Sequence, residues 1–385
     1  MLHVDKENAR NNFRKFICLV DRVLFLHYSS DIQRFHVKCY DDQGIDSFRA
    51  NAWVSAALCL NVQELDLDLS LLEESTYKLP GDLFTCDTLV VLKLSIIFEL
   101  NVPARACLPS LKVLHLEYVI YASDESIERL IASCPVLEDF VTNLFYWDNV
   151  PKFSISSRTL KRLTMVNDFD STCCVKDVVI NAPCLVYLEY EDYAADCYSL
   201  TNLDSLVEAR VRMSVGYEFD YNVSVPAFFR GIGNVQSLYL SDHAIEAIQL
   251  HCHPLPVLCN LTRLEIDADE QTMAQGLPEL LERCPNLENI FYKGLGVNRD
   301  GLYSGDWNPP EVVPSCLLFQ LKEIVIYLTC WEKEVKMVKY FLKNARVLRN
   351  LTACSAIVEE KFQLKIAKEL LMLPRGSSEC EVMFI

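Results

Sequence analysis

Glycine is scarce in this chain, and long apolar runs are absent. Only 11 of the 385 residues are glycine, which argues against glycine-rich phosphate-binding loops and against sheets made of many tight hairpins. No run of about 18 apolar residues occurs, so the sequence predicts no transmembrane helix. The opening MLHVDKENARNNFRKF lacks the apolar core of a secretory signal peptide. We therefore expect a cytoplasmic or nuclear chain without a membrane span.

Basic residues are also fewer than acidic residues in this chain. The 36 lysines and arginines are outnumbered by 53 aspartates and glutamates, which gives a formal net charge of −17. Such a surface repels phosphate backbones and anionic membranes at long range. We therefore expect neither nucleic acid nor membrane as a partner, whereas a protein with a basic surface would be attracted.

The 17 cysteines are an odd number, and many stand among apolar residues, as in ALCLNV and APCLVY. A secreted disulfide scaffold is usually short and begins with a signal peptide. Neither condition holds here, so the sequence predicts reduced thiols in a large core. Hydrophobic residues make up 51% of the chain and charged residues 23%, which is enough to build such a core.

A recurring apolar pattern organises the chain. In SLKVLHLEY, Leu111, Leu114 and Leu116 form L-x-x-L-x-L, and other apolar residues substitute elsewhere. The spacing between matches averages about 26 residues, inside the range of leucine-rich repeats. The pattern begins at Ile32, Val62, Leu89, Leu111, Leu137, Leu160, Leu185, Leu206, Val235, Leu261, Leu287 and Leu321.

Each match has the alternation of a strand with one buried side, and strands of this kind share a core only when they are stacked. Two of the segments between matches, 123–134 and 276–284, have apolar residues at helical spacing and end at Cys-Pro. Ser123 is the expected N-cap of the first. The predicted fold is an α/β leucine-rich-repeat solenoid, a horseshoe with a parallel β-sheet on its concave face.

The segments LIASCPVLEDF, LLERCPNLENI and LPSLKVLHLEYV resemble the leucine-rich repeats of plant F-box proteins. The words VPSCL, KYFLKNARVL and LPRGSSECEV resemble the FBD domain that closes many such chains. The resemblance implies a post-F-box helical cap at 1–30, a repeat array at 31–293 and an FBD domain at 315–385. Between the last two lies a loop rich in glycine and proline at 294–314. The FBD region is expected to form two helices and a closing strand that cap the solenoid.

In the resembling family, the F-box binds the Skp adaptor of a cullin-type ubiquitin ligase. Residues 1–12, MLHVDKENARNN, contain none of the F-box pattern. The resemblance therefore implies the substrate-recognition part of a ligase receptor, and we expect no adaptor binding unless an F-box exists upstream. The alternative is a stand-alone repeat scaffold, or a competitor that has the recognition surface and no ligase role.

No catalytic motif or cofactor signature appears. The chain has no G-x-S-x-G, no H-E-x-x-H and no activated-cysteine context, so we expect no enzyme and no cofactor. The segment LHCHPLPVLCN brings together His251, Cys252, His253 and Cys259, but its spacing does not match a zinc framework. A loop leading into the next strand is favoured there. The adjacent pair Cys173-Cys174 is expected to be reduced.

The repeat pattern also predicts a binding face. If the repeat leucines point inward, the residue between them points outward on the concave side of the sheet. Rings and arginines are favoured where proteins bind one another. The candidate protein-binding residues are His115, Arg162, Tyr187, Glu189, Arg210, Tyr239, Arg263, Glu265 and Phe291. Loops and the FBD end of the chain are the competing locations for this surface.

Overall fold

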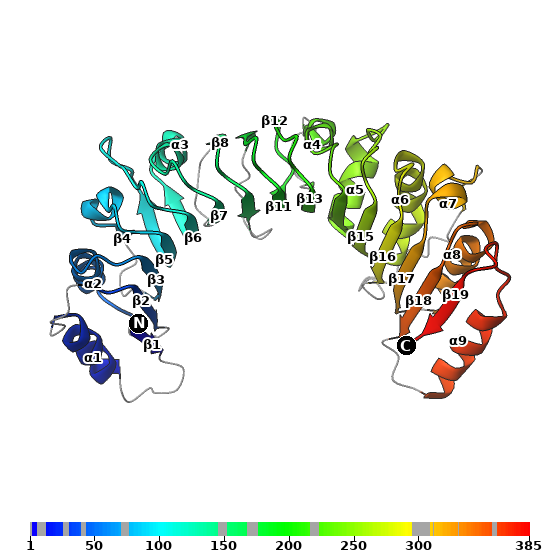
Figure 1. Ribbon diagram of the computed structural model, residues 1–385, viewed down its shortest axis with the longest axis horizontal. Coiled ribbons are helices and arrows are strands. Elements are labelled where there is room, and N and C mark those ends of the chain that lie inside the picture. The colour runs from blue at the N-terminus through cyan, green and yellow to red at the C-terminus, as the bar shows by residue number, and fades with distance from the viewer. Residues whose placement is uncertain are drawn as a thin grey trace. The chain divides into compact units, whose positions relative to one another are not determined.

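The structure is a computed structural model with two compact units, Met1–Ser205 and Leu206–Ile385. Within each unit, parallel strands form a sheet that carries a layer of helices or further strands on one side (Figure 1). The described residues are 2–5, 13–25, 31–39, 44–70, 77–144, 152–167, 176–215, 223–294, 309–310, 312–329, 331–355 and 360–385.

The main sheet of the N-terminal unit is entirely parallel. The short strand β4, Tyr77–Lys78, pairs with β5 outside the main order. In spatial order the other strands are β1 (Leu2–Asp5), β2 (Arg34–Cys39), β3 (Glu64–Leu69), β5 (Val91–Leu100), β6 (Val113–Tyr121), β7 (Asp139–Leu144), β9 (Arg162–Val166) and β11 (Tyr187–Tyr193).

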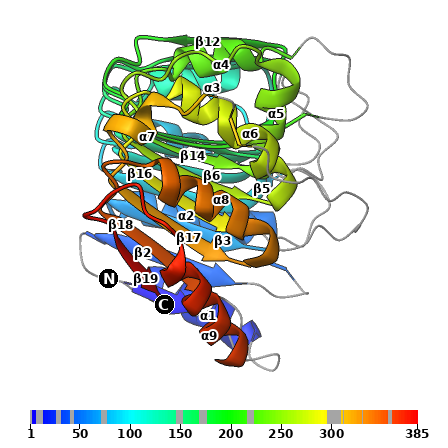
Figure 2. The ribbon, with the colours of Figure 1, turned by 90° about the vertical axis from the view of Figure 1, so that its right-hand side faces the viewer.

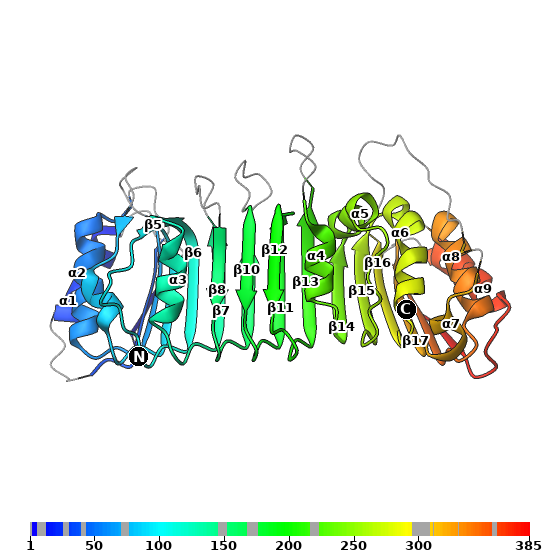
Figure 3. The ribbon, with the colours of Figure 1, turned by 90° about the horizontal axis from the view of Figure 1, so that it is seen from above.

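Helices and a second sheet cover one side of this main sheet. The helical elements are α1 (Phe13–Phe25), α2 (Ser47–Cys59), the 3₁₀ turn η1 (Gly81–Thr85) and α3 (Glu125–Ala132). They are followed by β8 (Lys152–Ser156), β10 (Asp177–Asn181) and β12 (Cys197–Thr201), which pair in parallel in the order β12-β10-β8 (Figure 3). In this region the chain returns through extended segments such as DVVIN, rich in β-branched residues, instead of helices.

The C-terminal unit repeats the arrangement with a helix in each return between its strands (Figure 2). Its strands, in spatial order, are β13 (Glu208–Ser214), β14 (Ser237–Ser241), β15 (Arg263–Ala268), β16 (Asn289–Gly294), β17 (Glu323–Leu328), β18 (Asn350–Ser355) and β19 (Glu381–Phe384). Its helices are α4 (Val225–Gly231), α5 (Asp242–His251), α6 (Glu270–Arg283), α7 (Ser315–Phe319), α8 (Trp331–Asn344) and α9 (Glu360–Met372).

The strand pairing confirms the repeat pattern inside each unit. Each predicted match leads into a strand, and equivalent positions pair in register, as Leu65 does with Leu92 and Leu92 with Leu114. Leu114 and Leu116 are at most 1% exposed. A parallel α/β sheet with leucine-rich repeats is therefore confirmed, whereas the horseshoe curve stays a prediction.

The two predicted return helices form, with different starts. Leu130 of α3 and Leu280 of α6 are buried, as are Cys134 and Cys284 where those helices end. The N-cap of α3 is Asp124 rather than Ser123, and its side chain makes no capping hydrogen bond, while the Ser123 hydroxyl forms a hydrogen bond with that of Ser126. Helix α6 begins earlier than expected, where the Asp269 carboxylate accepts a hydrogen bond from the backbone N–H of Thr272.

The ends of the chain also differ in detail from the sequence prediction. The expected N-terminal helix is α1, but Leu2–Asp5 forms strand β1 beside β2. In the FBD region α8 ends at Asn344, and the strand β18 then pairs with both β17 and the closing strand β19. Strand β17 also pairs with β16, so the FBD strands continue the sheet of this unit. Most of the 294–314 loop lies outside the described residues.

One buried carboxyl group stands out in the N-terminal unit. Asp192 on β11 is 3% exposed, and its Oδ1 accepts hydrogen bonds from Asn167 Nδ2 at 3.0 Å and from the Tyr193 N–H at 2.7 Å. Burial raises the pKa of Asp192 to about 7, because a charged carboxylate is poorly solvated there. The ionised form of this group therefore opposes folding.

The register of β6 can be tested by a matched pair of substitutions. Leu114→Asp would place a carboxylate in a fully buried position and should lower the free energy of unfolding by about 3 kcal/mol or more. His115→Gln, at the neighbouring outward position, should cost well under about 1 kcal/mol. Urea denaturation followed by circular dichroism measures both, and equal losses would show that the strand faces are assigned wrongly.

The substitution Asp192→Asn should stabilise the protein as the pH rises. The folded state holds a proton on this group between the unfolded value of 3.8 and about 7, so the stability contributed by Asp192 is present at low pH and lost across that interval. The side-chain oxygen of the introduced asparagine can still accept both hydrogen bonds. Urea titrations should show the stability difference, variant minus wild type, growing by on the order of 2–4 kcal/mol from pH 4 to pH 8. A difference independent of pH would refute the assignment.

Candidate protein-binding face

The open face is the side of each main sheet that points away from the buried leucines. Half-buried and exposed side chains alternate there with the core residues along most strands, as in the pattern of β3, whereas β14 and β18 have buried residues on both sides. Parallel pairing aligns these side chains into rows that run across the strands. In the N-terminal unit the central row is His36, Asp66, Lys93, His115, Val141, Thr164 and Glu189. In the C-terminal unit it is Arg210, Tyr239, Glu265, Phe291, Val325, Thr352 and Met383.

On the open face, the first strands of the N-terminal unit carry ionisable side chains that pair directly with one another. Strand β2 supplies cationic or imidazole side chains and β3 supplies carboxylates at paired positions. The Arg34 Nε lies 2.7 Å from Glu64 Oε2, and the His36 Nδ1 lies 2.8 Å from Asp66 Oδ2. Both distances lie within hydrogen-bond range, and the His36 and Asp66 side chains form a hydrogen bond. These side chains on β2 and β3 are therefore already paired with one another.

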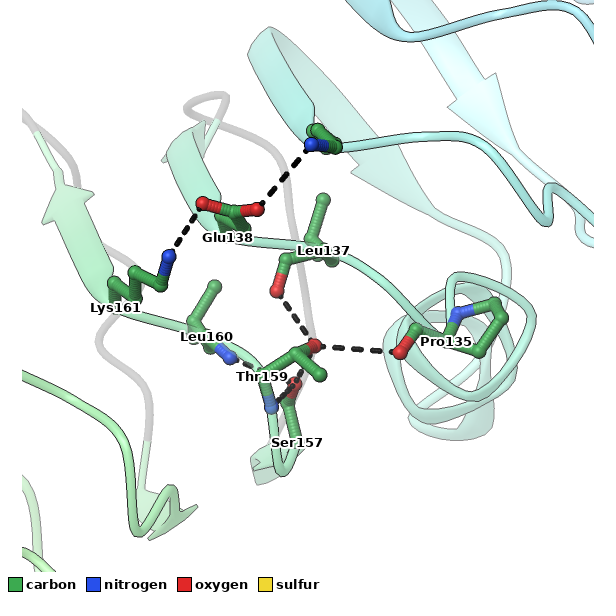
Figure 4. A network of polar contacts seen from close by, with 8 residues as sticks. Pro135, Leu137, Glu138, Ser157, Thr159, Leu160 and Lys161 are labelled. Carbon is green, nitrogen blue, oxygen red and sulfur yellow. Dashed lines mark hydrogen bonds and ion pairs between the residues drawn. The ribbon is translucent and has the colours of Figure 1, made fainter.

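A second set of polar contacts lies where strands β7 and β9 begin (Figure 4). The Glu138 carboxylate accepts a hydrogen bond from Lys161 Nζ at 2.7 Å and pairs with Lys112 Nζ at 3.6 Å. The hydrogen bond and charge of Lys161 lower the pKa of Glu138. The Thr159 hydroxyl donates to the Leu137 carbonyl at 2.8 Å. These contacts join neighbouring repeats at the starts of their strands.

His115, the first predicted site residue, is partly buried on β6. Burial and the nearby charge of Lys93 lower its pKa, which outweighs the opposing effect of Asp139. The His115 Nε2 lies 4.0 Å from Asp139 Oδ1 and makes no hydrogen bond among the described residues. Since a lowered pKa favours the neutral ring, His115 offers an uncharged imidazole at neutral pH.

Arg162, Tyr187 and Glu189 form one contact group. Arg162 and Tyr187 are paired positions on β9 and β11, and the guanidinium carbon lies 3.9 Å from the centre of the tyrosine ring. The Tyr187 hydroxyl donates to Glu189 Oε2 at 2.7 Å. The stacked ring holds the arginine plane against the sheet while the outer side of the guanidinium remains accessible.

Tyr239 is more deeply placed than the sequence predicted. The ring was expected at the surface, but the residue is only 5% exposed. The guanidinium carbons of Arg210 and Arg212 lie 4.0 and 4.8 Å from its centre and cover it. Its hydroxyl donates to Asp267 Oδ2 at 3.2 Å. Tyr239 therefore supports arginines and does not itself present a ring to a partner.

Arg263, Glu265 and Phe291 complete the predicted set. The Arg263 guanidinium carbon lies 4.0 Å from the centre of the half-buried Phe291 ring. Arg263 Nη2 and Arg210 Nη1 lie 3.8 and 3.9 Å from the same atom, Glu265 Oε2. The structure thus brings Arg210, Tyr239, Arg263, Glu265 and Phe291 together on the C-terminal unit. His115 stands apart from the group of Arg162, Tyr187 and Glu189 on the N-terminal unit.

Sequence reasoning missed Arg212, although it stands one outward position after Arg210 in the sequence EARVRMS. Both residues point to the same side of β13, because side chains two positions apart on a strand share a face. Listing every outward position of the strand, not only the one between two apolar residues, would have found it.

The histidine and cysteine segment 251–259 does not gather into a metal site in this structure. Cys252 is buried after helix α5, Cys259 is exposed, and His253 Nδ1 lies 3.0 Å from Glu279 Oε2. Within the described part of the chain, no three histidine, cysteine or acidic side chains meet in an arrangement that could hold a metal ion. None of the described helices is both long and apolar enough to cross a bilayer.

The cysteines in the described residues are free thiols, and several belong to the core. Burial raises the pKa of both Cys134 and Cys316 to about 11. Because the thiolate is the reactive form, these groups are poor nucleophiles at neutral pH. The pair Cys173-Cys174 lies outside the described residues.

These observations define a class of protein: a leucine-rich-repeat chain whose open sheet face carries arginines on aromatic rings. Comparisons with known proteins agree on the leucine-rich repeats. Residues 50–202 match the family model described as "FBD-associated F-box protein At5g56370, LRR repeats". Residues 308–352 match the FBD model.

Proteins of Arabidopsis thaliana are similar over nearly the whole chain. The putative F-box/LRR-repeat protein At3g59230 is 32% identical over 96% of this chain and 81% of its own length. The putative F-box/FBD/LRR-repeat protein At3g59240 is 32% identical over 97% of this chain and 77% of its own. The F-box/LRR-repeat protein At4g14096 is 31% identical over 100% and 84%. The chain belongs to the plant F-box/LRR-repeat family.

We expect purified protein to contain far less than one equivalent of zinc per chain. The 251–259 segment lacks a zinc framework, and His253 is held by Glu279. Elemental analysis of the protein as isolated measures the metal, and Ellman titration in denaturant without reductant should find nearly all 17 cysteines reactive. Stoichiometric zinc that is lost in a His253→Ala variant would overturn this expectation.

Proposed function

We propose that this chain is the substrate-recognition part of a cullin-type ubiquitin-ligase receptor, and that it binds its partner protein on the open face. Family membership supports a protein-interaction repeat module related to such receptors. The observation that carries the location is the Arg162–Tyr187–Glu189 group. It places an ordered guanidinium on the open face with no hydrogen bond of its own among the described residues.

The energetics of association favour such a group. An arginine that is already stacked on a ring loses less side-chain entropy on binding than a free arginine does. Rings and arginines are enriched among the residues that dominate binding energy. The net charge of −17 adds long-range attraction for a partner with a basic surface. No reaction is assigned to the chain, because its role is to hold the partner.

The proposal predicts that changing the open face removes partners without unfolding the protein. In plant cells, chemical crosslinking and mass spectrometry would compare wild type with Arg162→Glu, which reverses the charge over Tyr187. We expect recovery of the specific partner to fall by about tenfold or more, since hot-spot losses of about 1.4 kcal/mol or more are common. The same partner should accumulate when the proteasome is inhibited.

The matched control is Arg129→Glu on helix α3. Arg129 is exposed and forms an ion pair with Glu125 on the side of the unit away from the open face. Both variants should keep the wild-type thermal midpoint within a few degrees. Equal recovery of partners with Arg162→Glu and wild type would refute binding on the open face of the N-terminal unit. A partner lost with Arg162→Glu but never ubiquitinated would instead show a scaffold without a ligase role.

A further inference from the structure

The C-terminal unit contains an incomplete ion cluster on its open face. Arg210 of β13 and Arg263 of β15 converge on one oxygen of Glu265, at 3.9 and 3.8 Å. These distances are too long for hydrogen bonds between nitrogen and oxygen. Neither guanidinium makes a hydrogen bond elsewhere in the described residues. One carboxylate therefore stands between two cations, and most of their N–H donors are unused.

The ion pair between Arg34 and Glu64, on the open face of the N-terminal unit, can be compared with this cluster. There Arg34 Nε lies 2.7 Å from Glu64 Oε2, an ion pair at hydrogen-bond distance. Arg34 is opposed by one carboxylate at hydrogen-bond distance, whereas Arg210 and Arg263 share a single carboxylate about an ångström further away. For Arg263 the difference is not explained by solvent exposure, because the side chains of Arg34 and Arg263 are 53% and 48% exposed, whereas that of Arg210 is 25% exposed.

The two arginines are held in place by the sheet beneath them. The Arg210 guanidinium carbon lies 4.0 Å from the centre of the buried Tyr239 ring, and that of Arg263 lies 4.0 Å from the centre of Phe291. One flat side of each guanidinium is therefore occupied by a ring, while the N–H groups point along its edges. Such an arrangement is ready to accept a planar acceptor group with little further loss of entropy.

We propose that Arg210 and Arg263 form a subsite that takes one carboxylate, from an aspartate or glutamate side chain of the bound partner. This inference rests on the proposed function, because it assigns a chemical feature to the partner segment on the open face. A single carboxylate can reach both arginines, since both already lie within 4 Å of Glu265 Oε2. The incoming group would accept hydrogen bonds from N–H groups that Glu265 reaches only at 3.8 and 3.9 Å.

The surrounding charge limits what kind of partner fits. Asp267 and Glu265 lie on β15 beside the subsite, and the chain as a whole carries −17. A strongly acidic segment would be repelled at long range, whereas a neutral or basic segment with one well-placed carboxylate would not. The subsite therefore selects an isolated acidic residue within a partner surface that is otherwise neutral or basic.

A peptide titration tests the subsite without knowledge of the partner. The probe is a short peptide of serine and tyrosine with one central glutamate, acetylated and amidated at its ends. The control is the same peptide with glutamine in place of the glutamate. Protein labelled with ¹⁵N-arginine reports each Nε–Hε resonance. We expect the glutamate peptide to shift the Arg210 and Arg263 resonances and to bind at least about fivefold more tightly than the glutamine peptide, as a charge-assisted contact allows.

Variants should separate the subsite from general charge effects. Arg263→Ala and Arg210→Ala should abolish the preference for glutamate, Arg263→Lys should keep only part of it, and Glu265→Gln should increase it because the internal competitor loses its charge. Arg346→Ala, an exposed arginine between α8 and β18, is the matched control and should change nothing. Arg263→Gln covers the case in which an alanine variant fails to fold.

Equal binding of the two peptides, or no shift of either arginine with any peptide, would overturn the subsite. The open-face proposal is judged separately by Arg162→Glu, which lies in the other unit. If partner recovery depends on Arg162 while the protein binds the glutamate and glutamine peptides equally, only the carboxylate subsite is refuted. If the protein prefers the glutamate peptide and partner recovery is unaffected by Arg162→Glu, binding at the N-terminal unit is refuted and the carboxylate subsite is supported.

Discussion

In-register parallel pairing is the constraint on which the rest of each unit depends. Because Leu65, Leu92 and Leu114 pair directly, every residue at an equivalent position is placed on the same side of the sheet. Buried leucines then form one continuous layer, and the residues between them form rows on the open face. A slip of one residue in any strand would exchange the two sides and expose the apolar layer.

Sequence periodicity was sufficient for the strands that follow the L-x-x-L-x-L matches and for two of the return helices, because both signals are local. The L-x-x-L-x-L pattern marks a strand within a few residues, and an apolar stripe ending at Cys134-Pro135 or Cys284-Pro285 marks a helix. The β8-β10-β12 sheet could not be predicted in this way. Its strands pair only with one another across successive returns, so each short segment shows its partner only once the fold exists.

The sequence predicted on which face of the sheet the candidate residues lie, but not how deeply each of them is buried. The register that placed Arg210, Tyr239 and Glu265 on the open face follows from alternation along β13, β14 and β15. Whether a ring on that face is exposed depends on the neighbouring strands, and two arginines from β13 cover Tyr239. Pattern reasoning assigns a side to each residue, whereas burial depends on which long side chains lean over it.

The same register explains why the open face has chemically different parts. On β2 and β3, oppositely charged residues meet at paired positions, so Arg34 and Glu64 neutralise each other. On β13 to β15, Arg210 pairs with Tyr239 and Tyr239 with Glu265, so the nearest carboxylate is two strands away from Arg210. A ring between an arginine and its carboxylate orients the cation but leaves its N–H donors unsatisfied. Placing an aromatic residue at the paired position therefore separates Arg210 from Glu265, whereas a carboxylate at that position on β3 lies directly beside Arg34.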